Sequence, residues 1–427
     1  QWCMEPAGGS EQVVPYISER TIAELKEYYP DALPVETKSL PEALSQINAL
    51  TGKKFIIIID EWDVLIRDAA TNGKVQEAYI NFLRGMFKGT EPTKYIQLAY
   101  LTGILPVKKE KTQSALNNFD EFTMLSASNL APYIGFTEDE VEKLSKEYHQ
   151  DFDKVKRWYD GYLLKDYQVY NPRAVVGVML KGEFKSYWSE TASYEAVTPL
   201  INMNYDGLKT AIIEMLSGAN VKVDTATFKN DTVNIHSKDE VLTYMIHLGY
   251  LGYDFSHKSV FIPNNEIRGE FVNAVSVSQW GEVSKALKNS ADLLNAIWRK
   301  DEEKVAAYME QAHFETSHLQ YNNENALSCT INLAFYFARE YYTIVRELPT
   351  GKGFADIVMI PRKLHIDKPA VVIELKWDKS VSGAIEQIKR NEYIDVLRDY
   401  KGNLLLAGIN YSKKTKKHTC MIEQVQL

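Results

Sequence analysis

Near the C-terminal end of the chain, two apolar runs flank a turn, and each run contains an acidic residue. The first run, residues 356–361, begins with Asp356, and the second, residues 370–376, contains Glu374. If the runs pair as an antiparallel hairpin centred near His365, Asp356 lies directly opposite Glu374, because each is nine positions from that centre. The sequence therefore predicts a sheet that brings two carboxylates together at one point.

Lys376 joins these acids because side chains alternate between the two faces of a strand. Glu374 and Lys376 are two positions apart and share a face, whereas Ile373 and Leu375 point to the other. An isolated Glu-x-Lys pattern is usually a solvated cross-strand pair, but a charge inside an apolar run is costly unless it is paired. Carboxylates suit Mg²⁺ or Mn²⁺, and a metal beside a lysine can stabilise the charge that develops in phosphodiester hydrolysis. We therefore predict that Asp356 and Glu374 bind a metal and that Lys376 assists catalysis.

Two further residues complete a pattern that resembles the PD-(D/E)XK nuclease superfamily. Glu324 is predicted to lie on a helix, on the same face as Leu327, Ile331, Phe335 and Ala338. Gln387 lies on the helix that follows the Glu-x-Lys strand. The superfamily pattern is a helix glutamate, a strand aspartate, Glu-x-Lys, then a helix with a polar residue. The resemblance covers roughly the last 130 residues and implies a metal-dependent nuclease whose catalytic residues are Glu324, Asp356, Glu374, Lys376 and Gln387.

Basic residues also gather in this part of a chain whose net charge is −8. A local basic groove can supply phosphate contacts whatever the total charge, so DNA or RNA remains a candidate partner. Two interpretations stay open for residues 413–417, a phosphate-binding surface or a solvated hairpin turn. The basic residues concerned are Lys389, Arg390, Arg398, Lys413, Lys414, Lys416 and Lys417.

The N-terminal part predicts an α/β domain with a parallel sheet. A helix is expected from Pro41, with Ser39 as its cap, to Gly52, and another over residues 74–88. Apolar strands are expected over residues 54–59 and 95–103. Continuous apolar strands separated by helices are typical of a parallel sheet that is covered on both faces.

Asp60 and Glu61 follow the first of these strands, in the form of a Walker B strand, where the acids serve Mg²⁺ and the attacking water. Thr102, at the end of the second strand, is a candidate sensor of the γ-phosphate, or it only caps the strand. Together with Trp62-Asp63 and Asn117-Asn118-Phe119, these residues resemble a predicted AAA-ATPase family that is often fused to such nucleases in bacteria. Further motifs in the middle of the chain share this resemblance and are expected to be core: residues 157–162, residues 170–172 and Tyr187-Trp188.

The Gly-x-x-x-x-Gly-Lys-Ser/Thr motif does not occur in the 427 residues. Without its backbone N–H groups and lysine there is no cradle for the β- and γ-phosphates of ATP. The sequence therefore predicts weak or no ATP binding by this chain. The resemblance implies that the phosphate-binding loop precedes residue 1 and that the complete protein binds ATP.

The organisation predicted is an incomplete P-loop-type sheet domain in residues 1–134, a mainly helical extension in residues 135–299, and a restriction-endonuclease-like α/β domain in residues 300–427. Short strands are expected near residues 221–235 and 250–262. No apolar run approaches the ~20 residues of a membrane helix. The three cysteines lie far apart, which fits a reducing, cytoplasmic setting; the oligomeric state stays open.

The leading hypothesis is an ATPase-linked nuclease, in which the ATPase half regulates or positions a Mg²⁺-dependent phosphodiesterase. The alternative is a regulatory protein whose degenerate nuclease fold only binds nucleic acid or a partner. An inactive gene fragment is a third hypothesis.

Overall fold

The computed structural model describes residues 9–68, 73–104, 109–110, 113–114, 116, 118–188, 194–203, 205–228, 235–278, 280–316, 333–350, 353–390 and 403–426. Contacts divide the chain into two compact units. The first comprises residues 1–143, 161–171 and 222–258, and the second comprises residues 144–160, 172–221 and 259–427. Within the described ranges no helix has the length and apolarity that a membrane span requires. The three-domain division of the sequence stays a prediction.

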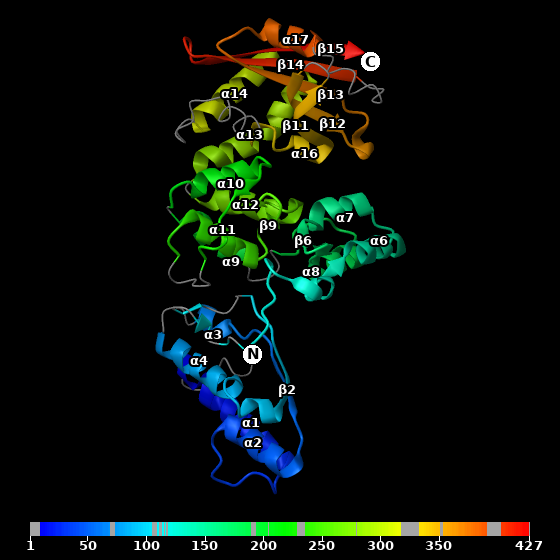
Figure 1. Cartoon of the computed structure of the whole chain (residues 1–427). Helices are drawn as coiled ribbons and strands as arrows, with labels where there is room; N and C mark the ends of the chain where they lie inside the picture. The colour runs from blue at the N-terminus through cyan, green and yellow to red at the C-terminus, as the bar shows by residue number, and fades with distance from the viewer. Residues whose placement is uncertain are drawn as a thin grey trace. The chain divides into compact units, whose positions relative to one another are not determined.

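The N-terminal elements form a small parallel α/β layer in the first unit (Figure 1). Helix α2 (Leu40–Thr51) ends at Gly52, whose left-handed backbone (φ 69°) suits a residue without Cβ. Strand β1 (Phe55–Ile59) pairs in parallel with β2 (Ile96–Leu101), and α4 (Gly73–Phe87) lies between them in the sequence. These elements confirm the predicted helices and strands. The cap was predicted wrongly in one detail, because the Ser39 side chain makes no capping hydrogen bond.

One face of the β1–β2 pair packs on helices, and the other face is apolar but uncovered. Phe55, Ile57 and Ile59 contact the core formed with α1 (Val13–Tyr28), α2 and α4. On the opposite face Ile56 and Ile58 are 63% and 68% exposed, and Leu98 and Tyr100 are also exposed. The prediction of cover on both faces is therefore wrong for the described residues. A run of four isoleucines cannot distinguish one covered face from two, because apolar residues occupy both.

The rest of the first unit contains short elements that the sequence did not predict. Strands β5 (Phe136–Thr137), β7 (Tyr167–Tyr170) and β6 (Tyr162–Leu164) form an antiparallel sheet in that spatial order. The Tyr162 hydroxyl donates to the Gly249 carbonyl at 2.6 Å, just after helix α11 (Lys238–His247). These strands of two to four residues are too short for a clear alternation of apolar and polar positions.

The helices of the second unit include α7 (Phe152–Tyr159), α8 (Pro172–Lys181), α9 (Tyr194–Ile201), α10 (Leu208–Leu216), α12 (Asn265–Val277), α13 (Gly281–Trp298) and α14 (Glu302–Thr316). Arginines stabilise the end of α10, where backbone carbonyls lack partners in the helix. Arg268 donates to the Leu216 carbonyl at 3.0 Å, and Arg339 donates to the Ser217 carbonyl. Arg362 in turn donates to the Arg339 carbonyl at 3.2 Å.

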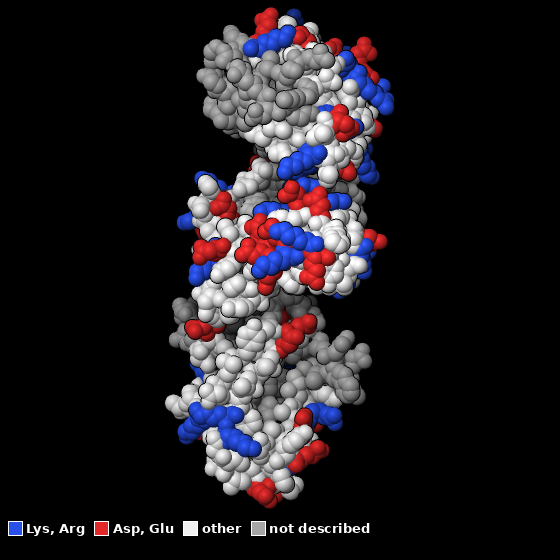
Figure 2. Space-filling model, turned by 90° about the vertical axis from the view of Figure 1, so that its right-hand side faces the viewer, with Lys and Arg blue, Asp and Glu red and all other residues white. Residues whose placement is uncertain are grey.

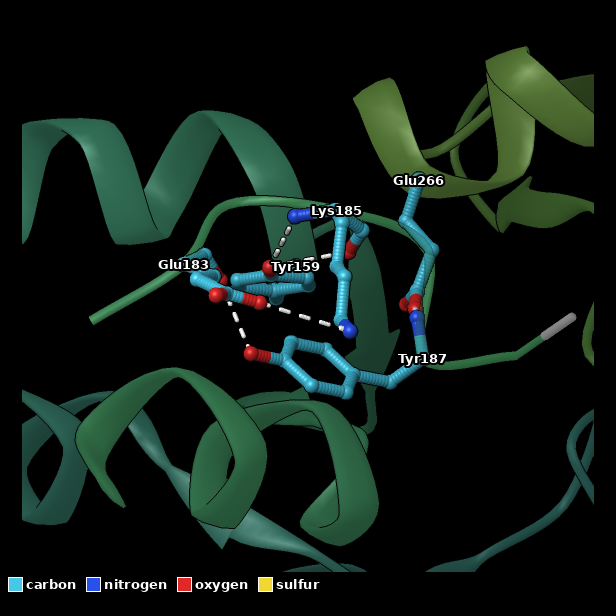
Figure 3. A network of polar contacts seen from close by, with 5 residues as sticks. All are labelled: Tyr159, Glu183, Lys185, Tyr187 and Glu266. Carbon is cyan, nitrogen blue, oxygen red and sulfur yellow. Dashed lines mark hydrogen bonds and ion pairs between the residues drawn. The ribbon is translucent and has the colours of Figure 1, made fainter. Parts of the chain in front are cut away.

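A polar network ties residues 183–188 to α7 and α12 (Figure 3). The Tyr159 hydroxyl donates to the Lys185 carbonyl at 3.0 Å, and the Tyr187 hydroxyl donates to the Glu183 carbonyl at 2.8 Å. Glu266 accepts the Tyr187 N–H at 2.7 Å. Tyr159 and Tyr187 are buried, which confirms that these two residues of the aromatic motifs are core.

Glu266 holds this network with a carboxylate that is almost fully buried. Burial raises the pKa of Glu266 to about 7; the N–H groups of Tyr187 and Trp188 oppose the increase, and Glu270 adds to it. Glu270 lies one helical turn away, and its Oε1 accepts from the Ser186 hydroxyl at 2.6 Å. Two neighbouring carboxylates in a buried site favour the protonated form of one of them.

The C-terminal sheet has five strands in the order β11-β12-β13-β14-β15 (Figure 1). They are β11 (Tyr342–Thr350), β12 (Gly353–Pro361), β13 (Ala370–Trp377), β14 (Asn403–Ser412) and β15 (Lys417–Gln426). Only β13 and β14 pair in parallel; the other neighbours are antiparallel. Helices α13, α14 and α16 (Ala338–Tyr341) share a core with one face. Helix α17 (Val381–Arg390) covers the other.

The sequence prediction missed the two edge strands of this sheet, β11 and β15. Strand β11 contains Arg346, Glu347 and Pro349. Proline cannot donate a ladder hydrogen bond and is confined to edges, and edge strands need no continuous apolar run. Strands β12 and β13 were predicted correctly, because they are central strands whose apolar runs are buried on both faces.

We predict that Glu266→Gln makes stability less dependent on pH. The pKa of Glu266 lies above its unfolded value, so its contribution is complete below about pH 4.5 and is lost as pH rises through about 7. Between about pH 5 and pH 8 the wild type should lose about 2–3 kcal/mol of unfolding free energy that the variant keeps.

Urea unfolding at both pH values measures this difference. Glu303→Gln, at an exposed position of α14, is the matched control and should follow the wild type. Equal pH dependence in Glu266→Gln and the wild type would contradict the assigned cause.

Candidate functional site

The β12–β13 hairpin has the predicted register. Ile357 pairs with Ile373, Val358 with Val372 and Met359 with Val371, so the hairpin is centred on residue 365. Asp356 and Glu374 are the next residues beyond the Ile357–Ile373 pair, on the side away from the turn. This confirms the strand pairing that the symmetric spacing of the two acids predicted.

Glu374 is buried on the face of β13 that α17 covers. Its side chain is 2% exposed, and that of Lys376 is 12% exposed. The Lys376 ammonium donates to Glu374 Oε1 at 2.8 Å and to Gln387 Oε1 at 2.7 Å. The Gln387 amide also donates to Glu374 Oε1. The structure therefore brings Glu374, Lys376 and Gln387 into one hydrogen-bonded cluster.

The second carboxylate oxygen of Glu374, Oε2, differs from Oε1 in its hydrogen bonding. Oε2 is buried and makes no hydrogen bond within the described part of the chain. A buried carboxylate oxygen without a donor is costly, because its desolvation is not compensated. This oxygen is consequently the one that suits a cation.

Asp356 lies beside the backbone of β13. Its Oδ2 accepts the Leu375 N–H at 2.6 Å, which fixes the carboxylate next to Glu374. Ladder pairing of the two strands ends at Ile357 and Ile373 among the described residues, and beyond it the aspartate side chain takes a backbone donor of the neighbouring strand. Asp356 is half-buried.

Electrostatics at the site disfavour the ionised form of Glu374. Burial raises the pKa of Glu374, the hydrogen bond from Lys376 opposes this increase, and the negative charge of Asp356 adds to it. A positive ion bound between the two carboxylates would relieve both the desolvation and the repulsion. The oxygen donors fit a hard divalent cation such as Mg²⁺ or Mn²⁺.

Helix α17 positions Gln387 because it approaches β14 closely at Gly408. Glu374 and Gly408 are partners in the parallel register. A Cβ on Gly408 would lie 2.7 Å from the Val381 carbonyl oxygen and 2.9 Å from Ala384 Cβ. The absence of a side chain at Gly408 therefore allows the contact, a contribution to the site that the sequence analysis missed.

The remaining predicted residue of the C-terminal site, Glu324, lies outside the described residues. Of the residues predicted to share its helix face, Phe335 and Ala338 are buried in the core beneath the sheet. The described residues contain no group of three or more histidine, cysteine, aspartate or glutamate side chains that could hold a metal. Asp356 and Glu374 thus form a pair of carboxylates, with Glu324 still a prediction.

The N-terminal candidate residues lie together at the ends of β1 and β2. The Thr102 hydroxyl donates to Asp60 Oδ1, and the Thr102 N–H donates to the Ile59 carbonyl at 2.9 Å. Glu61 is exposed and has a left-handed backbone (φ 50°). Asp63, which sequence analysis did not single out as a site residue, is fully buried and accepts the Ile104 N–H at 3.1 Å. Asp63 lies four residues after the end of β1, and the sequence analysis named it only as part of the family resemblance.

Each end of the chain matches a known protein family. Residues 11–112 match a family described as predicted AAA-ATPase, and residues 322–420 match the PD-(D/E)XK nuclease superfamily. The chain combines an AAA-ATPase-like domain with a PD-(D/E)XK nuclease domain. The five-stranded mixed sheet of the nuclease domain agrees with a restriction-endonuclease-like fold. The AAA-ATPase-like domain contributes a sheet of two parallel strands within the described residues.

A curated protein is also similar to part of this chain. It is described as an uncharacterized protein in the vnfD 5′ region of Azotobacter chroococcum mcd 1, and it is 28% identical over 155 residues. The match spans 36% of this chain and 30% of that protein's length. No solved structure matches the chain.

We predict that Gly408→Ala destabilises the nuclease domain by about 1–3 kcal/mol, because the added Cβ forces α17 away from β14. The measurement is the urea unfolding midpoint. Gly269→Ala is the matched control: a Cβ at this α12 position meets no atom within 4 Å. The control should be neutral or slightly stabilising, as alanine favours helix. Equal midpoints for Gly408→Ala and the wild type would show that α17 does not depend on this contact.

Proposed function

We propose that the nuclease domain hydrolyses phosphodiester bonds of DNA or RNA with a divalent metal, and that the AAA-ATPase-like domain regulates it. The observation that supports this most directly is the buried Glu374 carboxylate, held beside Asp356 with one oxygen on Lys376 and the other unpartnered among described residues. A structural ion pair needs no second acid at the same point.

Asp356 and Glu374 would hold the metal, and Mg²⁺ or Mn²⁺ would supply neutralisation of phosphate charge there. Lys376 uses two of its three N–H donors, on Glu374 and Gln387, and the third can hold an oxygen of water or phosphate. Gln387 keeps the Lys376 ammonium and Glu374 Oε1 together, so we assign it a positioning role. Glu324 remains a proposed additional carboxylate.

For the AAA-ATPase-like domain we propose that Asp60 and Glu61 are Walker B acids and that Thr102 reports the state of the nucleotide. The hydrogen bond between Thr102 and Asp60 supports a link between the ends of β1 and β2. Binding of ATP by these 427 residues is expected to be weak, since they contain no phosphate-binding loop motif.

A second candidate function is a non-catalytic binding protein with a nuclease fold. It is favoured by the finding that the described residues hold two site carboxylates rather than a cluster of three. A binder of this kind needs no metal at Asp356 and Glu374. Isothermal titration with Mn²⁺ separates the two functions, because the nuclease should take up metal and Glu374→Ala should not.

We predict that Glu374→Ala and Lys376→Ala each reduce cleavage at least about 100-fold, because they remove a metal ligand and a positive charge from the reacting centre. The measurement is cleavage of single- and double-stranded DNA and RNA with Mg²⁺ or Mn²⁺. Chelation of the metal should abolish it.

The matched controls are Glu386→Ala, at an exposed position of α17, and Lys363→Ala, exposed in the β12–β13 turn. Both should cleave like the wild type, and circular dichroism should show all four variants folded. Cleavage that survives both Glu374→Ala and Lys376→Ala would remove the assignment.

A further inference from the structure

A turn rich in lysine joins β14 and β15 at the end of the sheet where the nuclease site lies. Lys413, Lys414 and Lys416 lie in the turn, and Lys417 begins β15. All four side chains are exposed. Across the described part of the chain, no carboxylate forms an ion pair with any of them. Four neighbouring ammonium groups, none of them ion-paired among the described residues, form a positive surface, and the Asp378 carboxylate lies at the backbone of the turn.

The turn is held against the end of β13 by one backbone hydrogen bond and two hydrogen bonds from backbone N–H groups to side-chain oxygens. Asp378 follows Trp377, the last residue of β13, and its N–H donates to the Tyr411 carbonyl at 2.8 Å. Asp378 Oδ1 accepts the Lys413 N–H at 2.6 Å. The Lys379 N–H donates to Asn410 Oδ1 at 3.0 Å. A solvated turn has no need of such anchoring, whereas a binding surface gains from charges that are already in position.

The anchoring places the lysines at a defined distance from Glu374. Glu374 pairs with Gly408, and Lys413 lies five residues further along the chain. At about 3.3 Å per residue this separation is ~17 Å along the strand. Phosphates of one strand of duplex DNA follow each other every ~3.4 Å along the axis. For a substrate strand that runs along β14, this distance corresponds to about five nucleotides.

The lysine turn is positively charged in a chain whose total charge is negative. The net charge is −8, and Figure 2 shows Lys and Arg interspersed with Asp and Glu over the face it draws. A mixed surface neutralises its charge locally, so a polyanion gains most where several lysines lie together and none is ion-paired. In the turn only Thr415 accompanies the four lysines, and the Lys413 ammonium lies 5.6 Å from the centre of the Trp377 ring. The lysine charges offer contacts to phosphate.

We propose that the lysine turn, residues 413–417, binds the phosphate backbone of the nucleic-acid substrate. This inference rests on the proposed nuclease function, because that function makes nucleic acid the substrate. Binding through the turn is independent of base sequence, because phosphates are the groups that it contacts.

The test compares the full-length chain with a triple variant, Lys413→Gln, Lys414→Gln and Lys417→Gln. Glutamine keeps a long polar side chain and removes the charge, and Lys416 is left unchanged because its backbone is left-handed (φ 55°). The control triple, Lys285→Gln, Lys288→Gln and Lys363→Gln, changes the net charge equally at exposed positions elsewhere in the same unit.

Fluorescence anisotropy with labelled duplex and single-stranded DNA and RNA, in EDTA to prevent cleavage, measures affinity at several salt concentrations. The turn variant should bind on the order of tenfold more weakly at ~0.1 M salt. The slope of log affinity against log salt should fall by about two to three, as three phosphate contacts are lost. The control triple should match the wild type.

The results separate this inference from the nuclease proposal. Equal affinity and salt slope in the turn variant and the wild type would overturn the inference, whether or not the wild type cleaves. Absence of binding to all four nucleic acids would overturn it as well. Binding that depends on the turn in a chain that cleaves none of the substrates would retain the binding surface and reject the nuclease activity.

Discussion

The pairing of β12 with β13 is the constraint on which the C-terminal site depends. It places Asp356 beside the Leu375 N–H and orients Glu374 and Lys376 toward α17. A shift of one residue would turn Glu374 and Lys376 to the opposite face, into the core shared with α13 and α14. Burial then makes the cluster interdependent, because a carboxylate at 2% exposure needs donors, and Lys376 and Gln387 supply them to the same oxygen.

The sequence was most informative where the pattern of apolar residues and the spacing of charged residues predicted the same structure. Apolar runs identified the central strands, and the equal spacing of Asp356 and Glu374 from His365 identified their register. The sequence was least informative where a residue contributes because it has no side chain, or where it contacts a residue far away in the sequence. Gly408 contributes by having no side chain against α17, and the Thr102–Asp60 hydrogen bond joins residues 42 positions apart. Strands β11 and β15 were not predicted. Each lies at an edge of the sheet and is paired on one side only, and an edge strand needs no continuous apolar run. Glu324 falls outside the described residues, so its place in the site rests on the resemblance.

The two ends of the chain differ in how much of their chemistry is local. The candidate nuclease site draws its described residues from two neighbouring strands and the helix that follows them, within residues 356–387. The AAA-ATPase-like domain offers Asp60, Glu61 and Thr102 at the ends of two parallel strands, without a phosphate-binding loop in the sequence. In the helical part of the second unit the buried polar residues have a structural role. Tyr159, Tyr187 and Glu266 fix residues 183–188 by hydrogen bonds.

The uncovered face of β1 and β2 has a consequence for the behaviour of the chain in solution. Ile56, Ile58, Leu98 and Tyr100 present adjoining apolar side chains to water, on a sheet whose opposite face is packed. Such a surface favours association as protein concentration rises, since burying it releases ordered water. The particle size of this chain, measured by light scattering, should therefore increase with protein concentration.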